Sequence, residues 1–391
     1  MRRSYFDHAA TTPLDPRVLE AMLPFLRENH GNPSSLHWAG REALAAVELA
    51  RTQLARLLNA SAAEIVFTAS GTEAANLALL GAVGQPVIKT HVITSAFEHP
   101  AVLETCKFLA SQGVTVTLLP VTAEGLVDPA ALEEAIRPET RLISIMAANN
   151  VVGTLQAIPE LARIAREHNV LFHTDAVQAV GKVPFDLASQ PIDLLSLSAH
   201  KLYGPKGAGA LYVRKGVQLK PVLHGGGQEQ GLRPATENVA GIVGLGRAAE
   251  IAKEEMAGEA AHLVRWREVF IARVAASIPN TYLIGHPHRR LPGHICLGFA
   301  GQEGEAIKLM LALDEEGIAV STGSACSGKH SNAPSHVLQA MGFDALRARG
   351  LLRVSFGRFN TFDEIEHFLA ILPRIVASLR PLTAMRVQAH S

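Results

Sequence analysis

The chain alternates short apolar runs with longer stretches in which apolar residues recur every three or four positions. Seven apolar runs predict strands buried in a sheet, over residues 64–68, 91–95, 114–119, 141–147, 170–174, 194–198 and 208–213. Stretches of helical pattern lie before or between most of them, at 41–58, 72–80, 100–111, 129–136 and 159–168. This alternation predicts an α/β fold, with a mainly parallel seven-stranded sheet covered by helices on both faces.

The pattern changes after residue 257. A helix predicted over residues 238–256 leads into a second part, whose elements are a helix, a strand at 294–300, a helix at 303–313, a glycine- and serine-rich loop, a strand at 351–356 and a helix at 362–379. This order predicts a smaller α+β domain. We therefore expect a large domain over residues 14–257 and a small domain formed by residues 1–13 and 258–391.

Charge and composition narrow the classes of partner. The 391 residues include 36 lysines and arginines and 36 aspartates and glutamates, without a block of like charge. This balance argues against nucleic acid or an anionic membrane as the main partner. Charged residues make up 18% of the chain and apolar residues 48%, which suits a protein with much buried surface, often including a subunit interface.

The sequence also indicates the cellular compartment of the protein. The apolar runs are all shorter than the roughly 18 residues that a membrane helix needs, and no apolar core follows the two arginines near the N-terminus. Three cysteines, Cys106, Cys296 and Cys326, cannot form a disulfide framework, which indicates a reducing compartment. We expect a cytoplasmic protein.

A lysine at the end of a predicted buried strand is the first candidate for chemistry. Lys201 follows one strand closely, beside Ser198 and His200, while Asp175 and Gln178 lie at the end of another. A lysine and a carboxylate at the ends of neighbouring strands are the pair expected of a pyridoxal-phosphate enzyme. There the lysine holds the cofactor as a Schiff base and the carboxylate holds its pyridinium nitrogen. The other interpretation of Lys201 is a solvated surface lysine.

Further strand ends carry residues suited to binding an anion or a ring. Gly71 and Thr72 start a predicted helix, and free N–H groups at a helix N-terminus bind phosphate, although the same residues also suit an ordinary helix cap. His99 lies at the sheet edge where α/β proteins bind ligands, as a ring-stacking proton carrier or as a structural residue. Asn150 also follows a strand, to cap a turn or to bind cofactor or substrate.

The remaining candidates lie in the second part of the chain or near it. Cys326 is surrounded by small and polar residues, the setting of an accessible and reactive thiol, whereas Cys106 and Cys296 lie in apolar segments. Arg353 and Arg358 are candidates for a bidentate clamp on a substrate carboxylate.

The glycine-rich polar loop over residues 224–238 contains Thr236. This loop is either a linker or a segment that reaches across a dimer interface towards the phosphate.

These motifs resemble the cysteine desulfurases of the NifS/IscS type, which are pyridoxal-phosphate enzymes of the aminotransferase class V group. The similarity runs through nearly the whole chain: DHAATTP (7–13), GNPSS (31–35), SGTEAAN (70–76), EHPAV (98–102), NN (149–150), HTDAVQ (173–178), SLSAHKLYGPKGAGALYV (196–213), HGGGQEQGLRPATEN (224–238), STGSACS (321–327) and LRVSFGRF (352–359). The resemblance implies fold type I of the pyridoxal-phosphate enzymes.

The resemblance implies how the cofactor, pyridoxal 5'-phosphate, is bound. Lys201 would carry it covalently and later remove the α-proton of the substrate. Asp175 would pair with its ring nitrogen, Gln178 would bond its ring hydroxyl and His99 would stack on the ring. Its phosphate would be bound by Gly71, Thr72, Ser198 and His200, and by Thr236 from the neighbouring subunit.

The implied activity is the conversion of L-cysteine to L-alanine by a homodimer. Asn150, which would also contact the cofactor, and Arg353 would hold the substrate carboxylate, Arg358 would have a supporting role, and Cys326 would take the sulfur as a persulfide. The sulfur would then pass to an iron–sulfur scaffold or another acceptor protein.

The sequence leaves three alternatives to the cysteine desulfurase function. A selenocysteine lyase or another class V aminotransferase or lyase would share the fold, but an aminotransferase would not need Cys326. A cofactor-free scaffolding subunit is the alternative from another class, and the intact set of Asp175, His200 and Lys201 argues against it.

The chain departs from the family pattern at three places. Val151 stands where a glutamate is usual, and Pro234-Ala235 replaces Ser-Gly before Thr236, which stiffens that loop. The tail after Leu379 does not resemble the longer IscS tail that meets the scaffold protein. The first two departures bear on loop geometry and the third on the scaffold partner.

Overall fold

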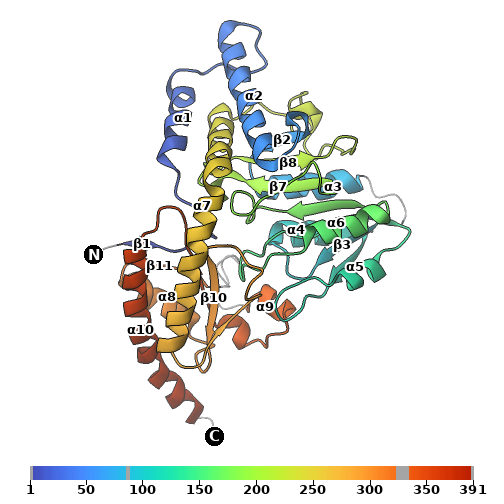
Figure 1. Cartoon of the computed structure of the whole chain (residues 1–391). Helices are drawn as coiled ribbons and strands as arrows, with labels where there is room; N and C mark the ends of the chain where they lie inside the picture. Colours follow the sequence, from blue (N-terminus) through green and yellow to red (C-terminus); the bar gives the residue numbers. More distant parts are fainter. Residues whose placement is uncertain (1–2, 85–88, 323–333, 389–391) are drawn as a thin grey trace.

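The computed structural model describes residues 3–84, 89–322 and 334–388, with the side chains of the last helix described up to residue 379. At its centre is a seven-stranded sheet (Figure 1) in the order β2 (Ile65–Thr68), β8 (Gly209–Val213), β7 (Leu194–Ser198), β6 (Leu171–Asp175), β5 (Thr140–Ser144), β3 (His91–Ser95) and β4 (Thr115–Leu119). Neighbouring strands are parallel, except that β8 runs antiparallel to both β2 and β7. The predicted α/β class and mainly parallel sheet are confirmed.

Helices cover both faces of this sheet because its strands are apolar on both sides. On one face, α3 (Gly71–Val83) and α4 (Pro100–Ser111) enclose an apolar cluster that includes Leu79 and Val102. On the other face lie α2 (Trp38–Leu58), α5 (Pro129–Ala135), α6 (Ile158–Glu167) and the start of α7 (Val239–Ser277). The short helix α1 (Pro16–Arg27) packs against α7.

Helix α7 differs from the expectation. The sequence predicted that one helix ends at residue 256 and that another begins near Gly258, but α7 is one helix of 39 residues. A Cβ built on Gly258 would meet nothing within 4 Å, so this glycine costs the helix only its propensity, about 1 kcal/mol. The helix therefore passes without interruption from the first part of the chain into the second.

The second part is built around a three-stranded antiparallel sheet in the order β12 (Leu351–Ser355), β10 (His294–Phe299) and β9 (Thr281–Leu283). Helices α7, α8 (Ala306–Glu315) and α10 (Phe362–Gln388) pack with it, and α9 (His336–Ala340) lies beside a separate small apolar cluster. Figure 1 shows α10 and α8 beside α7, away from the large sheet.

The start of the N-terminal segment packs with the second part, whereas Ala9, Ala10 and Thr12 bond to residues 200–203 of the first part. Strand β1 (Ser4–Tyr5) pairs with β11 (Ile318–Ala319), and Phe6 stacks on Phe368 at 5.3 Å between ring centroids. The assignment of residues 1–13 to the small domain stays a proposal. Among the described residues no helix is both long and apolar enough to cross a membrane.

Candidate active site

The carboxyl ends of the parallel strands meet at a cavity of about 530 Å³. Strand β6 ends at Asp175, β7 ends at Ser198, and β2 is followed by the N-terminus of α3. Nine of the twelve predicted site residues line this cavity: Gly71, Thr72, His99, Asn150, Asp175, Gln178, Ser198, His200 and Lys201. These nine residues come from five separate stretches of the sequence and meet in one place.

Lys201 reaches the cavity from a short 3₁₀ turn, Ala199–Lys201, directly after β7. Its Nζ donates hydrogen bonds to the backbone carbonyl oxygens of Ala9 and Ala10, both at 2.6 Å. The N-terminal segment therefore supplies two acceptors that hold this amine at the cavity wall.

Asp175 is a buried carboxyl group, with 5% of its surface exposed. One of its oxygens, Oδ1, accepts a hydrogen bond from the backbone N–H of Val177 at 3.0 Å. Burial raises the pKa of Asp175, while the neighbouring His99 and Lys201 act in the opposite direction. A cationic ring nitrogen in the cavity would compensate this buried charge, as the pyridinium of the expected cofactor does.

His99 has two roles in this geometry. It is the N-cap of α4, because its Nδ1 accepts a hydrogen bond from the backbone N–H of Ala101 at 3.1 Å. Burial lowers the pKa of His99, which favours the neutral ring, and an accepting Nδ1 leaves the proton on Nε2. His99 therefore has the structural role of a helix cap and also lines the cavity, while its role as a ring-stacking proton carrier stays a prediction.

The N-terminus of α3 forms one wall of the cavity. Ser70 caps the helix, because its Oγ accepts from the backbone N–H of Glu73 at 3.1 Å, and Gly71 and Thr72 follow. A Cβ on Gly71 would lie 2.5 Å from Cγ2 of Val177, so only glycine allows this close packing. The first N–H groups of a helix form a favourable site for a phosphate.

Other polar groups surround the same end of the cavity. Ser198 and Lys206 line it, and Nδ1 of His200 lies 3.1 Å from Oγ1 of Thr11. Burial, together with nearby lysines, lowers the pKa of His200 to about 4, so its ring is neutral at physiological pH. An anion site at a helix start, a buried carboxylate and a lysine amine together fit pyridoxal phosphate in their chemistry.

Three predicted site residues do not line the cavity. Thr236 is exposed and follows Ala235, whose φ is +123°. Arg353 is buried, with Nη2 donating to Oδ1 of Asp7 at 2.8 Å and Nη1 to the carbonyl oxygen of Asn150 at 3.0 Å. Cys326 lies outside the described residues. The roles of all twelve residues remain predictions.

The paired asparagines have different surroundings. The Oδ1 of Asn149 accepts from the backbone N–H groups of Val151 and Val152 at 2.8 and 3.1 Å, and its Nδ2 donates to the carbonyl oxygen of Phe97 at 2.9 Å. Asn149 is therefore the turn cap, and Asn150 is the cavity residue. Val151 is buried in an apolar cluster with Phe97, a position that suits valine.

Sequence reasoning missed two contributors to the cavity wall and one buried acid next to it in the sequence. Lys206 looked like part of a glycine turn, and the carbonyl groups of residues 9–10 carry no side-chain signal. Glu98 was read only as part of a motif, yet it is fully buried, and its Oε1 accepts from Ser95 Oγ at 2.5 Å and from the Met146 N–H at 2.8 Å. Burial raises its pKa to about 8. The signal for Glu98 in the sequence was the position of an acidic residue directly before His99.

Solved structures resemble this fold over nearly its whole length. A NifS-like protein aligns with a TM-score of 0.90 and 41% sequence identity, covering 97% of this chain and all of that one. A structure of SspA in complex with cysteine aligns with a TM-score of 0.81 and 39% identity, covering 92% of this chain and all of the other. The fold is accordingly type I of the pyridoxal-phosphate enzymes, as expected.

Sequence relatives agree with the structural ones. The cysteine desulfurase IscS of Dictyoglomus turgidum is 49% identical over 383 residues, which are 98% of this chain and 96% of the relative. The cysteine desulfurase IscS of Methanosarcina thermophila is 48% identical over 382 residues, 97% of this chain and 94% of the relative. A family model, Aminotransferase class-V, matches residues 4–368. The chain therefore belongs to the aminotransferase class-V family and resembles its cysteine desulfurase members throughout.

Proposed function

We propose that this protein is a pyridoxal-phosphate-dependent cysteine desulfurase, which converts L-cysteine to L-alanine and transfers the sulfur to Cys326. The observation that carries the proposal is the convergence of Lys201, Asp175 and His99 with the N-terminus of α3 in one cavity. This cavity belongs to a chain that is 49% identical to a cysteine desulfurase over 98% of its length.

Each residue of the cavity has a task in this reaction. When bound, pyridoxal phosphate supplies an electron sink for negative charge at the substrate's Cα. Asp175 would keep the ring nitrogen protonated through its opposite charge, and His99 would hold the ring from one side. Lys201 would carry the cofactor and take the α-proton, and the start of α3 would bind the phosphate.

The sulfur step joins the substrate to Cys326. The bond between Cβ and sulfur of the substrate breaks, the electron pair stays with carbon, and a proton completes the methyl group of alanine. The sulfur forms a new bond to the Cys326 thiolate, which leaves a persulfide on the enzyme. Two thiols thus yield one C–H group and one persulfide, so no external oxidant or reductant is needed.

The described residues on both sides of Cys326 bond to neighbours of cavity-lining residues, because Arg353 donates to the carbonyl oxygen of Asn150 and Glu98 directly precedes His99. On one side, Ser321 and Arg353 exchange two backbone hydrogen bonds, at 2.8 and 3.2 Å. On the other side, Nε2 of His336 is bonded to the carbonyl oxygen of Glu98 at 3.0 Å. These anchors support a role for Cys326 at this cavity.

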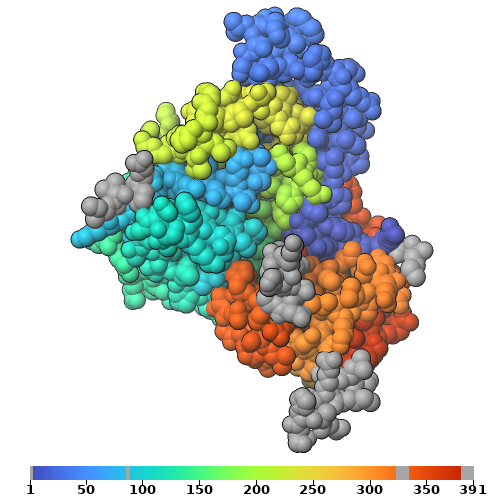
Figure 2. All heavy atoms as spheres, turned by 180° about the vertical axis from the view of Figure 1, so that it is seen from behind, coloured from blue at the N-terminus to red at the C-terminus, as the bar shows by residue number. Residues whose placement is uncertain are grey.

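The proposed enzyme is a homodimer. Thr236 is exposed and does not line the cavity of its own chain, which is consistent with a contribution to the partner's phosphate site. Large apolar side chains are also exposed near the start of α2, with Leu36 at 90% and Trp38 at 65%. Figure 2 shows this region projecting from the body of the molecule. A second subunit would cover such a surface.

We also propose that the enzyme works in the cytoplasm and passes its sulfur to an iron–sulfur scaffold or another acceptor protein. Two of its cysteines, Cys106 and Cys296, are free and buried. A reducing compartment would keep the Cys326 thiol available for the reaction.

The test is to incubate the purified, cofactor-loaded protein with L-cysteine and a reductant, and to measure alanine and sulfide. Equal amounts of the two products are expected. In a parallel sample without the reductant, mass spectrometry should show one added sulfur on the Cys326 peptide. Cys326→Ser should keep cofactor binding but release no alanine, while the matched variant Cys106→Ala should remain active. Wild-type turnover by Cys326→Ser would overturn the desulfurase proposal, and sedimentation as an active monomer would overturn the role of Thr236.

A further inference from the structure

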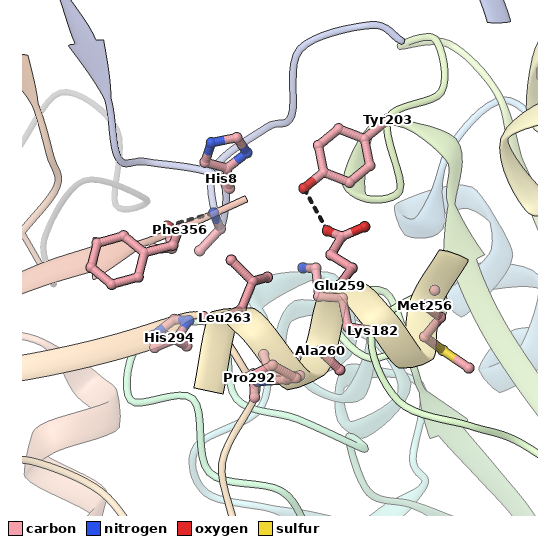
Figure 3. A pocket seen from close by; sticks show the side chains of 15 residues that line it. His8, Lys182, Tyr203, Met256, Glu259, Ala260, Leu263, Pro292, His294 and Phe356 are labelled. Carbon is pink, nitrogen blue, oxygen red and sulfur yellow. Dashed lines mark hydrogen bonds between the residues drawn. The ribbon is translucent and has the colours of Figure 1, made fainter. Parts of the chain in front are cut away.

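A second, much smaller cavity lies behind the wall of the candidate site. It has a volume of about 30 Å³, enough for one or two water molecules. Its lining comes from both parts of the chain and includes His8, Lys182, Tyr203, Glu259 and His294 (Figure 3). Ala9 lines both cavities, so the wall between them is thin.

A chain of hydrogen bonds crosses this wall. Nζ of Lys182 donates to Oε1 of Gln178 at 3.4 Å, and Nε2 of Gln178 donates to the carbonyl oxygen of Ala9 at 2.8 Å. The same carbonyl oxygen accepts from Nζ of Lys201 at 2.6 Å. On the other side of that residue, the Ala9 N–H donates to Oγ of Ser355 at 2.9 Å. Lys182 is therefore connected to Lys201 through the amide of Gln178.

The amide of Gln178 has two ends with opposite chemistry, and its neighbours decide which end points where. In the observed orientation, its oxygen meets the amine of Lys182 and its nitrogen meets the carbonyl of Ala9. A flipped amide would set two acceptors against each other at Ala9 and two donors against each other at Lys182. Gln178 lines the larger cavity. The two bonds to Lys182 and Ala9 therefore also fix the direction of the second N–H of its amide.

We propose that Lys182 is a positioning residue of the cofactor site, which fixes the amide of Gln178 with its second N–H available to the cofactor. This inference rests on the cofactor binding of the proposed function. Lys182 touches neither the larger cavity nor the predicted ligand, and it acts only through Gln178.

The surroundings of Lys182 make a lysine at this position unfavourable for stability. The titratable groups that line the small cavity with it are His8 and His294, whose pKa values burial lowers, Tyr203, whose pKa burial raises, and Glu259 on α7. The cations Lys201 and Arg353 also act on it. Burial, and then repulsion by Lys201, lowers the pKa of Lys182 to about 7. Leu263, Met256 and Phe356 also line the small cavity, so a methionine side chain would fit there with less desolvation. A lysine that costs stability points to a function.

The test compares Lys182→Met with wild type, Gln178→Met and the double variant, with the exposed Lys215→Met as the matched control. Affinity for pyridoxal phosphate and the pH midpoint of the bound cofactor's absorbance change are measured by spectroscopic titration. In Lys182→Met the second N–H of Gln178 is no longer fixed, which should weaken cofactor binding by roughly fivefold to tenfold, the effect of one hydrogen bond. It should also raise the absorbance midpoint, because a donor to the ring oxygen favours the deprotonated form.

The double variant shows whether Lys182 acts through Gln178. If Lys182 acts through Gln178, the double variant should match Gln178→Met alone, while Lys215→Met should match wild type. Thermal unfolding of the cofactor-free proteins checks folding, and Lys182→Met should melt no lower than wild type. Unchanged affinity and midpoint in Lys182→Met, or effects that add in the double variant, would overturn the proposal.

A crystal structure of cofactor-free Lys182→Met separates this proposal from the proposed function. The side chain of Gln178 should leave its bond to the carbonyl oxygen of Ala9. If wild-type protein takes up no pyridoxal phosphate, the proposed function fails, and this structure still decides on the positioning role. An unmoved Gln178 would overturn it.

Discussion

Lys201 and Ala10 lie 191 positions apart in the sequence, and Nζ of Lys201 donates to the carbonyl oxygen of Ala10 at 2.6 Å. Together with Ala9, this residue brings the N-terminal segment of the chain over the candidate site. A segment that looked polar and turn-rich from its sequence thus contributes to the environment of the central amine. Backbone carbonyl groups make this contribution, and every amino acid carries one.

Lys201 should be the residue that forms a covalent bond with the cofactor, because its amine lies at the cavity between Asp175 and the anion site. Lys201→Ala should lose the absorbance of the covalently bound cofactor and reduce turnover by about a thousandfold or more. Borohydride reduction of the wild-type protein, followed by peptide mapping, should label Lys201. Lys206→Ala should keep the covalent bond and only weaken phosphate binding. A label on Lys206 would refute the assignment.

Asp175→Asn should keep the shape of the site and remove its buried charge. Without a carboxylate beside the ring nitrogen, the pyridinium form would lose its partner, and kcat should fall by roughly a hundredfold to a thousandfold. Steady-state alanine production and cofactor absorbance measure the effect. Asp314→Asn, at an exposed position on α8, is the matched control and should behave as wild type. Activity of Asp175→Asn within tenfold of wild type would contradict the proposed pairing.

Ala235 has a φ of +123°, a conformation that strains residues with a Cβ and that glycine adopts readily. Ala235→Gly should relieve the strain and raise the free energy of unfolding by about 1 kcal/mol, after the entropy cost of glycine is subtracted. Urea unfolding measures this change. The control is Ala188→Gly, an exposed alanine without positive φ, which should be neutral or destabilising. A loss of stability in Ala235→Gly would show that the loop is unstrained.

Lys182 should make the stability of the cofactor-free protein depend on pH. Burial and the neighbouring Lys201 lower its pKa from the ordinary value of 10.5 to about 7 in the folded state, so folding disfavours the charged form. The cost is complete below pH 7, where Lys182 is charged in both states, and it disappears as the pH rises to 10.5. Lys182→Met should therefore exceed wild type in stability most at pH 6 to 7 and least near pH 10.5. Urea unfolding at several pH values tests this, and a pH-independent difference would refute it.

The strands were predictable because buried strands of a mainly parallel sheet are continuous apolar runs. The runs at 91–95 and 194–198 coincide with β3 (His91–Ser95) and β7 (Leu194–Ser198). Short elements in less regular surroundings were missed, among them β9 (Thr281–Leu283) and α1 (Pro16–Arg27), which contains Pro24. The end of α7 was misplaced because a glycine such as Gly258 weakens a helix without ending it.

The residues of the candidate site were predictable where they lie at the ends of strands. Residues such as Asp175 and Ser198 end parallel strands, and the carboxyl ends of such strands meet at one edge of the sheet. Lys182 was not predictable in this way, because its contact with Gln178 forms on the far side of the wall. The surroundings of Arg353 were also hidden, since its partner Asp7 lies 346 positions away.

Helix α7 has a mechanical consequence. At 1.5 Å per residue, its 39 residues form a rod of roughly 58 Å that is shared by both halves of the molecule. A hinge at residue 258 would have to break several consecutive backbone hydrogen bonds of this rod, whereas a hinge in an ordinary linker breaks none. The two halves are therefore expected to move as one rigid frame, with admission of substrate controlled by the rim of the cavity and not by opening and closing of the halves.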